Sequence, residues 1–210
     1  MNITRTANAG ILLELDGQRI LLDGVCGTVP PYLPTPDSIR LRLTRELPDL
    51  VAVTHRHADH CDAQFESDYT AASGRPVWGP HSAGQRLQCG PVSILAVESR
   101  HIGKADCPHV SYLVQGSQCV WFLGDAAPSQ WKNRQALPKP DVLVVPYAYA
   151  TTPSAWRITC SLGAKVVILL HLPPRQADPC GLWQAVEQTV AGPQELAVHI
   201  PQMGQTVTIR

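Results

Sequence analysis

The chain has 210 residues, 44% of them hydrophobic and 16% charged, which indicates a folded globular protein rather than a disordered one. Its length suits a single domain over residues 1–210 with one well-buried core. Its 17 lysine and arginine residues balance 17 aspartate and glutamate residues, and this balance argues against a nucleic-acid partner, which needs concentrated positive charge.

The start of the chain reads as strand-like sequence. It shows no basic leader followed by a long apolar run, and no segment is long enough to span a bilayer. We therefore expect a cytoplasmic chain without a membrane partner. Two apolar runs, residues 10–15 and 18–22, flank Asp16-Gly17, a pair typical of a two-residue hairpin turn.

The middle and the end of the chain predict helices among further strands. Thr35-Pro36-Asp37 predicts a helix start with the Thr35 hydroxyl as its cap, and the apolar run at residues 50–53 suits a strand buried on both faces. Later strands are expected at residues 92–97, 111–114, 120–123, 142–145, 166–170, 196–200 and 206–209, and helices at 153–162 and 178–190. Early hairpins followed by strand–helix alternation favour two mixed sheets packed together, with helices outside.

The segment "THRHADH", residues 54–60, holds three of the eight histidines of the chain. In extended backbone His55 and His57 point the same way, while Asp59 and His60, in a turn beyond them, can face a second point nearby. As an alternative to metal binding, any single one of these histidines could simply form hydrogen bonds within a polar loop. The H-x-H-x-D-H spacing directly after a buried strand instead favours metal binding, with room for two sites.

Single metal-ligating residues also follow three later strands. They are His101, Asp125 and His171. Loops at strand ends are where a rigid scaffold presents functional groups, so we expect these side chains to join the histidine segment.

Four segments, "LLDG", "THRHADH", "FLGD" and "LLHLP", together resemble the metallo-β-lactamase superfamily of hydrolases, and the resemblance extends over nearly the whole chain. It implies an α+β fold, a four-layer αββα sandwich of two mixed β-sheets flanked by helices. It also implies that one metal is held by His55, His57 and a third histidine, and the other by Asp59, His60 and His171. Asp125 would bridge the two metals, and Asp23 would steady the ligands from behind.

The third histidine is either His101 or His109. Both lie between the strand at residues 92–97 and the strand at 111–114. His101 is preferred because it follows a strand end, as the resemblance implies, whereas His109 has little loop left to reach back. His109 is then a substrate-facing or structural residue.

The expected chemistry is hydrolysis. Two divalent cations about 3.5–4 Å apart would lower the pKa of a bridging water and hold it as hydroxide, without a serine or cysteine nucleophile. Asp59 could accept or return a proton. Imidazole and carboxylate ligands suit zinc best, with manganese or iron as alternatives.

The substrate is expected to be a small-molecule lactone, amide or phosphoester. Among known groups the chain looks most like the compact ascorbate-6-phosphate lactonase branch. Tyr147, Tyr149 and Thr151 follow a strand end on the side of Asp125 and are expected to line the site, with packing in the core or in a homo-oligomer interface as the alternative. A phosphodiesterase or nuclease of the same fold, or a metal-binding relative without turnover, is the competing interpretation.

Overall fold

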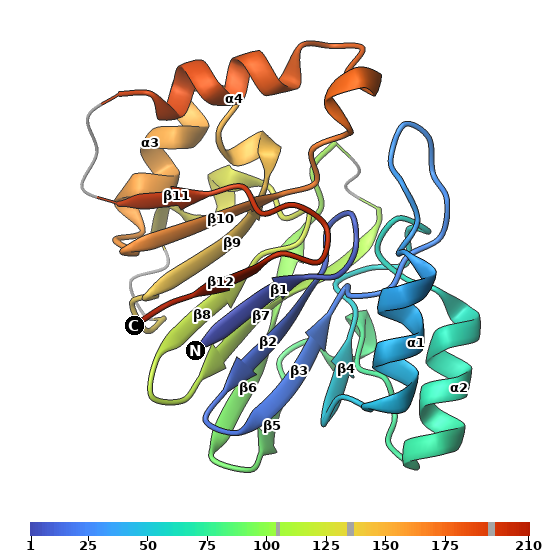
Figure 1. Ribbon diagram of the computed structural model, residues 1–210. Coiled ribbons are helices and arrows are strands. Elements are labelled where there is room, and N and C mark those ends of the chain that lie inside the picture. The colour runs from blue at the N-terminus through green and yellow to red at the C-terminus, as the bar shows by residue number, and fades with distance from the viewer. Residues whose placement is uncertain (104–105, 134–136, 193–195) are drawn as a thin grey trace.

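Two β-sheets lie face to face in the computed structural model, which describes residues 1–103, 106–133, 137–192 and 196–210 (Figure 1). The five-stranded sheet has the order β12-β1-β2-β3-β4, and the seven-stranded sheet has the order β11-β10-β9-β8-β7-β6-β5. The strands are β1 (Asn2–Arg5), β2 (Ile11–Leu15), β3 (Gln18–Leu22), β4 (Leu50–Ala52), β5 (Arg86–Cys89), β6 (Val92–Arg100), β7 (Pro108–Gln115), β8 (Cys119–Phe122), β9 (Val142–Pro146), β10 (Val166–Leu170), β11 (Ala197–His199) and β12 (Thr206–Thr208).

Helices cover the outer face of each sheet. In Figure 1, α1 and α2 lie beside the five-stranded sheet, and α3 and α4 lie beside the seven-stranded sheet. The helices are α1 (Asp37–Arg45), α2 (Ala63–Ser73), α3 (Pro153–Ser161) and α4 (Leu182–Val190), with short 3-10 turns η1 (Pro80–Ser82), η2 (Pro128–Asn133), η3 (Tyr147–Tyr149) and η4 (Arg175–Ala177). The described helices include none that is both long and apolar enough to cross a membrane.

Three buried apolar clusters hold these four layers together. Because successive side chains of a strand point to opposite faces, Leu13 enters the cluster between the sheets, whereas Leu12 packs outward with Phe65 and Tyr69 of α2. A third cluster joins the seven-stranded sheet to its helices, for example through Leu169 and Val186. The α+β sandwich expected from the sequence is therefore the observed fold.

The direction of the strands brings distant segments to one edge. In the seven-stranded sheet β8, β9 and β10 are parallel, and β6 runs the same way because both β6 and β8 are antiparallel to β7. In the other sheet β3 and β4 are parallel neighbours. Loops that follow parallel strands emerge at the same edge of their sheet, and these loops carry the polar residues singled out above.

The helix boundaries differ from the sequence prediction at three places. Thr35 does not cap α1, since Pro36 occupies the cap position and Thr35 Oγ1 accepts a hydrogen bond from Cys26 N at 3.0 Å. Helix α2 was not predicted. Helix α4 begins later than residue 178 because the Asp178 carboxylate accepts from the backbone N–H groups of Leu182 and Trp183, and so lies before the helix rather than within it.

Candidate metal centre

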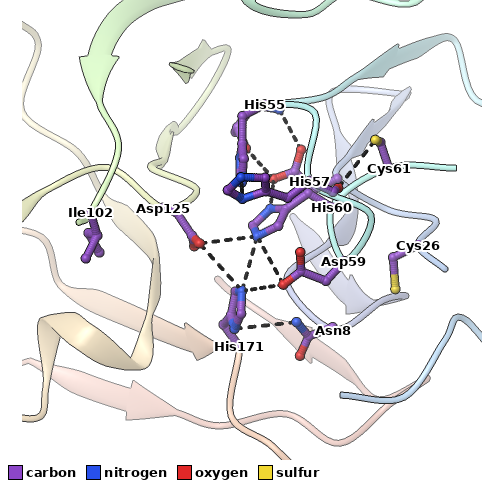
Figure 2. Close-up of polar contacts among 12 residues, drawn as sticks. Asn8, Cys26, His55, His57, Asp59, His60, Cys61, Ile102, Asp125 and His171 are labelled. Carbon is purple, nitrogen blue, oxygen red and sulfur yellow. Dashed lines mark hydrogen bonds and ion pairs between the residues drawn. The ribbon is translucent and has the colours of Figure 1, made fainter. Parts of the chain in front are cut away.

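Five strand ends contribute to one polar cluster. Asp23 follows β3, residues 55–60 follow β4, His101 follows β6, Asp125 follows β8 and His171 follows β10. Figure 2 shows His171 pointing toward His60, Asp59 and Asp125, with Asn8 behind it. The structure thus brings together residues that lie far apart in the sequence.

Three overlapping groups of side chains in this cluster could each hold a metal ion, since their ligand atoms lie within 4.8 Å of one another. The groups are His55, His57 and His101; His55, His60 and Asp125; and Asp59, His60 and His171. We call the first the three-histidine set and the last the mixed set. Asp125 lies between them, with Oδ2 3.7 Å from His101 Nε2 and 3.6 Å from His171 Nε2.

Hydrogen bonds fix which ring nitrogen faces the centre of the cluster. His60 Nδ1 donates to Asp23 Oδ2 at 2.8 Å, and His101 Nδ1 donates to the carbonyl of Ile102 at 2.6 Å. The Thr54 hydroxyl donates to Asp23, so it can only accept from His55 Nδ1, which lies 3.0 Å away. In His55 and His101, therefore, the neutral ring has its proton on Nδ1 and a lone pair on Nε2, and in His60 the nitrogen that faces the centre is likewise Nε2.

His171 is held differently from the other histidines. Its Nδ1 lies 3.4 Å from Asn8 Nδ2, while its Nε2 lies 3.1 Å from Asp59 Oδ2 and 3.1 Å from His60 Nε2. An amide carries both a donor and an acceptor, so a half-turn of the Asn8 side chain can support either tautomer of His171. The tautomer of His171 is thus adjustable where the other three are fixed.

Two buried atoms of the cluster lack a partner within the described chain. They are His101 Nε2 and Asp125 Oδ1. A buried polar atom without a partner costs stability, so such atoms require an explanation. Imidazole nitrogens with free lone pairs and a carboxylate oxygen are the donors that zinc and similar divalent ions take, so the residues present fit a metal centre.

The electrostatics of the cluster favour a cation. Burial acts to lower the pKa of His60, but the carboxylates of Asp125 and Asp23 outweigh it and raise that pKa well above its usual value. Burial acts to raise the pKa of Asp125, but His60 and His171 outweigh it and hold that pKa well below its usual range. For His55, by contrast, burial and the neighbouring His60 lower the pKa far below its usual value. The carboxylates that favour positive charge on His60 would favour a divalent cation at the same place, and the neutral ring of His55 leaves its Nε2 lone pair available to that cation.

The backbone is in an uncommon conformation at two of these positions. Within the described chain, non-glycine residues with positive φ are Asp16 in the hairpin turn, Asp23 (φ 47°) and His171 (φ 65°). Such conformations cost free energy and cluster at functional sites. Gly124, at φ 51°, precedes Asp125, and a Cβ there would collide with the side chain of Thr54. The chain is therefore shaped to aim Asp23, Asp125 and His171 at the centre.

Comparison with known proteins agrees with this geometry. A family model described as the β-lactamase superfamily domain matches residues 2–171. The chain belongs to this superfamily. Two residue pairs expected from its motifs, His60 with His171 and His55 with His57, are in contact. No curated protein matches the sequence.

Solved structures of low sequence identity share the fold of this superfamily member. A possible metal-dependent hydrolase from Veillonella parvula is 16% identical with a TM-score of 0.71, covering 100% of this chain and 99% of that one. An isothiocyanate hydrolase from Delia radicum gut bacteria is 15% identical with a TM-score of 0.72 and the same coverage. Igni18, a metallo hydrolase from Ignicoccus hospitalis, is 21% identical with a TM-score of 0.63, covering 100% and 98%.

The two candidates for the third histidine of this superfamily site lie in different surroundings. His101 belongs to a group with His55 and His57, whereas His109 belongs to none of the three-residue groups of the described chain. His109 lies within β7, its Nδ1 2.7 Å from Ser99 Oγ, and burial lowers its pKa to about 3. Its ring nevertheless lies 5.0 Å from that of His55, so it packs directly behind the three-histidine set.

Of the three residues expected to line the site, the structure brings only Tyr147 to it. Its ring lies 5.9 Å from that of His171. Tyr149 is buried in the core, where its hydroxyl accepts from Trp131 Nε1 and donates to the carbonyl of Ala126. Thr151 lies with Trp156 in a groove between α3 and α4. The expectation of a common wall does not agree with these placements.

Tyr32 is a residue of the site that sequence reasoning missed. Its ring meets that of His171 edge-on at 4.6 Å. Burial, then Tyr147, raises the pKa of Tyr32 far above its usual value, so its hydroxyl stays protonated. Tyr32 lies in a proline-rich loop, whose composition gives no signal for this role.

Proposed function

We propose that this chain is a metal-dependent hydrolase with two divalent ions, zinc first, with manganese or iron as alternatives. His55, His57 and His101 would hold one ion, Asp59, His60 and His171 the other, and Asp125 would contact both. The observation that carries the proposal is the convergence of the Nε2 atoms of His60 and His101 on Asp125 Oδ2, at 3.5 and 3.7 Å, with His55 in the same group. Asp23 would orient two of these rings, one directly and one through Thr54.

The ions, when bound, lower the pKa of a water molecule and stabilise negative charge that develops on the substrate. The side chains supply the remaining steps. Asp59 can accept a proton from the attacking water and return it to the leaving group, since its Oδ2 lies at the mixed set, 3.1 Å from His171 Nε2. The rings of Tyr32 and Tyr147 cover His171 and restrict the access of other water.

The proposed substrate is a small molecule with a lactone, amide or phosphoester bond. The fold alone does not choose among these bonds, because proteins of one fold carry out different reactions. The balanced charge of the chain supports a small-molecule substrate over a nucleic acid. We also propose that the chain is related to the ascorbate-6-phosphate lactonase branch. Self-association into a homo-oligomer is a further part of the proposal.

Metal analysis combined with a substrate panel tests this function. The purified chain should contain close to two divalent ions per molecule and hydrolyse at least one member of a panel of lactones, aryl esters, amides and phosphodiesters. A chelator should abolish the activity and added Zn²⁺ restore it. Asp125→Ala should lower kcat/KM by about 1000-fold, because a metal ion contributes several kcal/mol to catalysis. Fewer than one ion per chain, with no turnover of any compound, would contradict the proposal and favour a non-catalytic relative.

A further inference from the structure

Each histidine proposed as a metal ligand has one ring nitrogen at the centre and one behind it. The nitrogen behind a metal ligand normally donates a hydrogen bond to a carboxylate, a carbonyl or water, and this partner holds the ring in place. For four of the rings the partner is an oxygen atom or an amide: Thr54 behind His55, Asp23 behind His60, Ile102 behind His101 and Asn8 behind His171. Behind the remaining ring, that of His57, lies a sulfur atom.

His57 faces the centre with the opposite nitrogen from the other rings. Its Nδ1 lies 2.9 Å from His55 Nε2, within the three-histidine set. Its Nε2 points away from the centre and lies 3.9 Å from Cys107 Sγ. The fold thus brings Cys107, which is 50 residues further along the chain and directly precedes β7, to the back of this ring.

The proton of His57 has to lie on Nε2 when Nδ1 binds an ion. A neutral imidazole carries one proton, and the nitrogen that binds a metal needs its lone pair. Without an ion, His57 Nδ1 can donate to the lone pair of His55 Nε2. With an ion between them both lone pairs are needed, so His57 loses the proton on Nδ1 and takes one up on Nε2. This exchange moves no heavy atom, and it leaves an N–H group directed at Cys107.

The Cys107 sulfur is oriented to accept from this N–H group. A thiol has one weakly donating proton and a weakly accepting sulfur. The Cys107 thiol donates to the carbonyl of Pro108, which lies 4.0 Å from Sγ. Toward His57 Nε2 the sulfur can therefore only accept.

A second cysteine contacts His57 at a different place. Cys61 Sγ donates to the backbone carbonyl of His57 at 3.4 Å (Figure 2). This contact does not involve the ring, so it does not determine which ring nitrogen carries the proton. Both cysteines are partly buried. Cys61 and Cys107 therefore form a matched pair, one in contact with the backbone of His57 and the other with its ring.

We infer that Cys107 is a positioning residue of the metal centre: its sulfur accepts a hydrogen bond from His57 Nε2 and so holds the ring in the tautomer that presents a lone pair at Nδ1. This inference rests on the proposed metal-dependent function and adds a residue to its site. It also makes the three-histidine set depend on a thiol, because loss of the sulfur as an acceptor weakens binding of the ion there.

Zinc affinity in substituted proteins tests the inference. Each substitution is made in the His171→Ala background, so that the three-histidine set is the complete one, and the affinity is measured by competition with a chelator. Cys107→Val is close in size and removes the acceptor, so it should lower the affinity about tenfold, the usual effect of losing a partner behind a metal ligand. Cys107→Ser keeps an acceptor and should retain most of the affinity. Cys61→Val is the matched control and should lower the affinity much less than Cys107→Val does.

The position of the ring proton separates this role from an effect on packing. In the zinc-loaded chain labelled with ¹⁵N at histidine, long-range ¹H–¹⁵N spectra should place the His57 proton on Nε2. The signal of this proton should be lost to solvent exchange in Cys107→Val and kept in Cys61→Val. A proton on His57 Nδ1 would overturn the inference, as would equal losses of affinity in Cys107→Val and Cys107→Ser or in Cys107→Val and Cys61→Val.

Two further outcomes distinguish this inference from neighbouring ones. With Co²⁺ in place of zinc, a sulfur-to-metal charge-transfer band that disappears in Cys107→Val would make Cys107 a direct ligand and overturn the positioning role. Zinc binding with the expected tautomer but without turnover of any substrate would contradict the hydrolase function alone. A wild type that binds no zinc would overturn both.

Discussion

The two ligand sets share the loop after β4 but are supported in different ways. In the three-histidine set, His55 donates to Thr54 and His101 donates to a backbone carbonyl, so neither ring can change its tautomer without losing a hydrogen bond. In the mixed set, His171 rests on the Asn8 amide, which suits either tautomer. We expect the first ion to be held more tightly than the second, because less of its site has to rearrange on binding.

Removing one histidine from each set is the strongest way to test this difference. His101→Ala and His171→Ala should each reduce kcat/KM by about 1000-fold, since both ions would contribute to the same reaction under the proposed function. His171→Ala should retain one tightly bound ion, whereas the ion left in His101→Ala should be lost more readily to a competing chelator. Metal analysis after gel filtration measures both. If either variant keeps two ions, the assignment of that histidine is wrong.

Substitution of Asn8 sharpens the comparison with a smaller effect. Asn8→Ala removes the hydrogen-bond partner of His171 Nδ1 and should lower the affinity for the second ion about tenfold. Loss of a residue that hydrogen-bonds to a metal ligand generally has an effect of this size. Asn8→Asp offers only acceptor oxygens, so the proton of His171 stays on Nδ1. This substitution should therefore raise the affinity for the second ion. Chelator titration of each variant gives the affinities, and the first ion serves as the internal control. Equal weakening by both substitutions would refute the tautomer argument.

The smallest expected effect concerns the loop that both sets share. Asp62 follows this loop and caps α2 through Phe65 N, and the hydrogen bond from Arg40 lowers the pKa of Asp62 against the opposing effect of burial. The stabilisation is present above the unfolded-state pKa of about 3.9 and disappears as the pH falls through the folded-state pKa. Asp62→Ala should therefore cost about 1 kcal/mol at pH 7 and less below about pH 4.

Urea denaturation of the wild type and Asp62→Ala at several pH values measures this difference. Asp62→Asn is the matched variant, because it keeps a capping oxygen and loses the charge. It should cost less than Asp62→Ala at pH 7 and show little pH dependence. A difference between wild type and Asp62→Ala that stays constant down to pH 3 would show that the Asp62 charge contributes nothing.

The sequence predicted much of the fold because its signals were local. Asp16-Gly17 has the positive φ angles of a hairpin turn, and the apolar runs became strands of both sheets. Helix α2 was missed because only Phe65 and Tyr69 among its residues are buried, which leaves a weak apolar period. The prediction that the Thr35 hydroxyl caps the helix was wrong, because the loop brings Cys26 N to this hydroxyl instead. Local sequence patterns do not predict a contact between residues this far apart.

At the site, the residues that follow strand ends lie together, as expected from the sequence, whereas those placed beyond the strand ends do not. Tyr147, Tyr149 and Thr151 were expected on one wall because they follow a strand end on the side of Asp125. The chain turns there into a 3-10 helix, Tyr147–Tyr149, so Tyr147 and Tyr149 point to different sides. Tyr32 could not be found because its contact with His171 joins segments whose proximity only the folded sheets determine.

The separation of the ligands along the chain has a consequence for synthesis on the ribosome. His55, His57 and His101 have all been synthesised once the first half of the chain is made, but the mixed set is complete only when His171, after β10, has been added. That strand lies between β9 and β11, so a second ion, as proposed, could be captured only after most of the seven-stranded sheet has formed. Loading of the second ion would then mark a nascent chain whose folding is nearly complete.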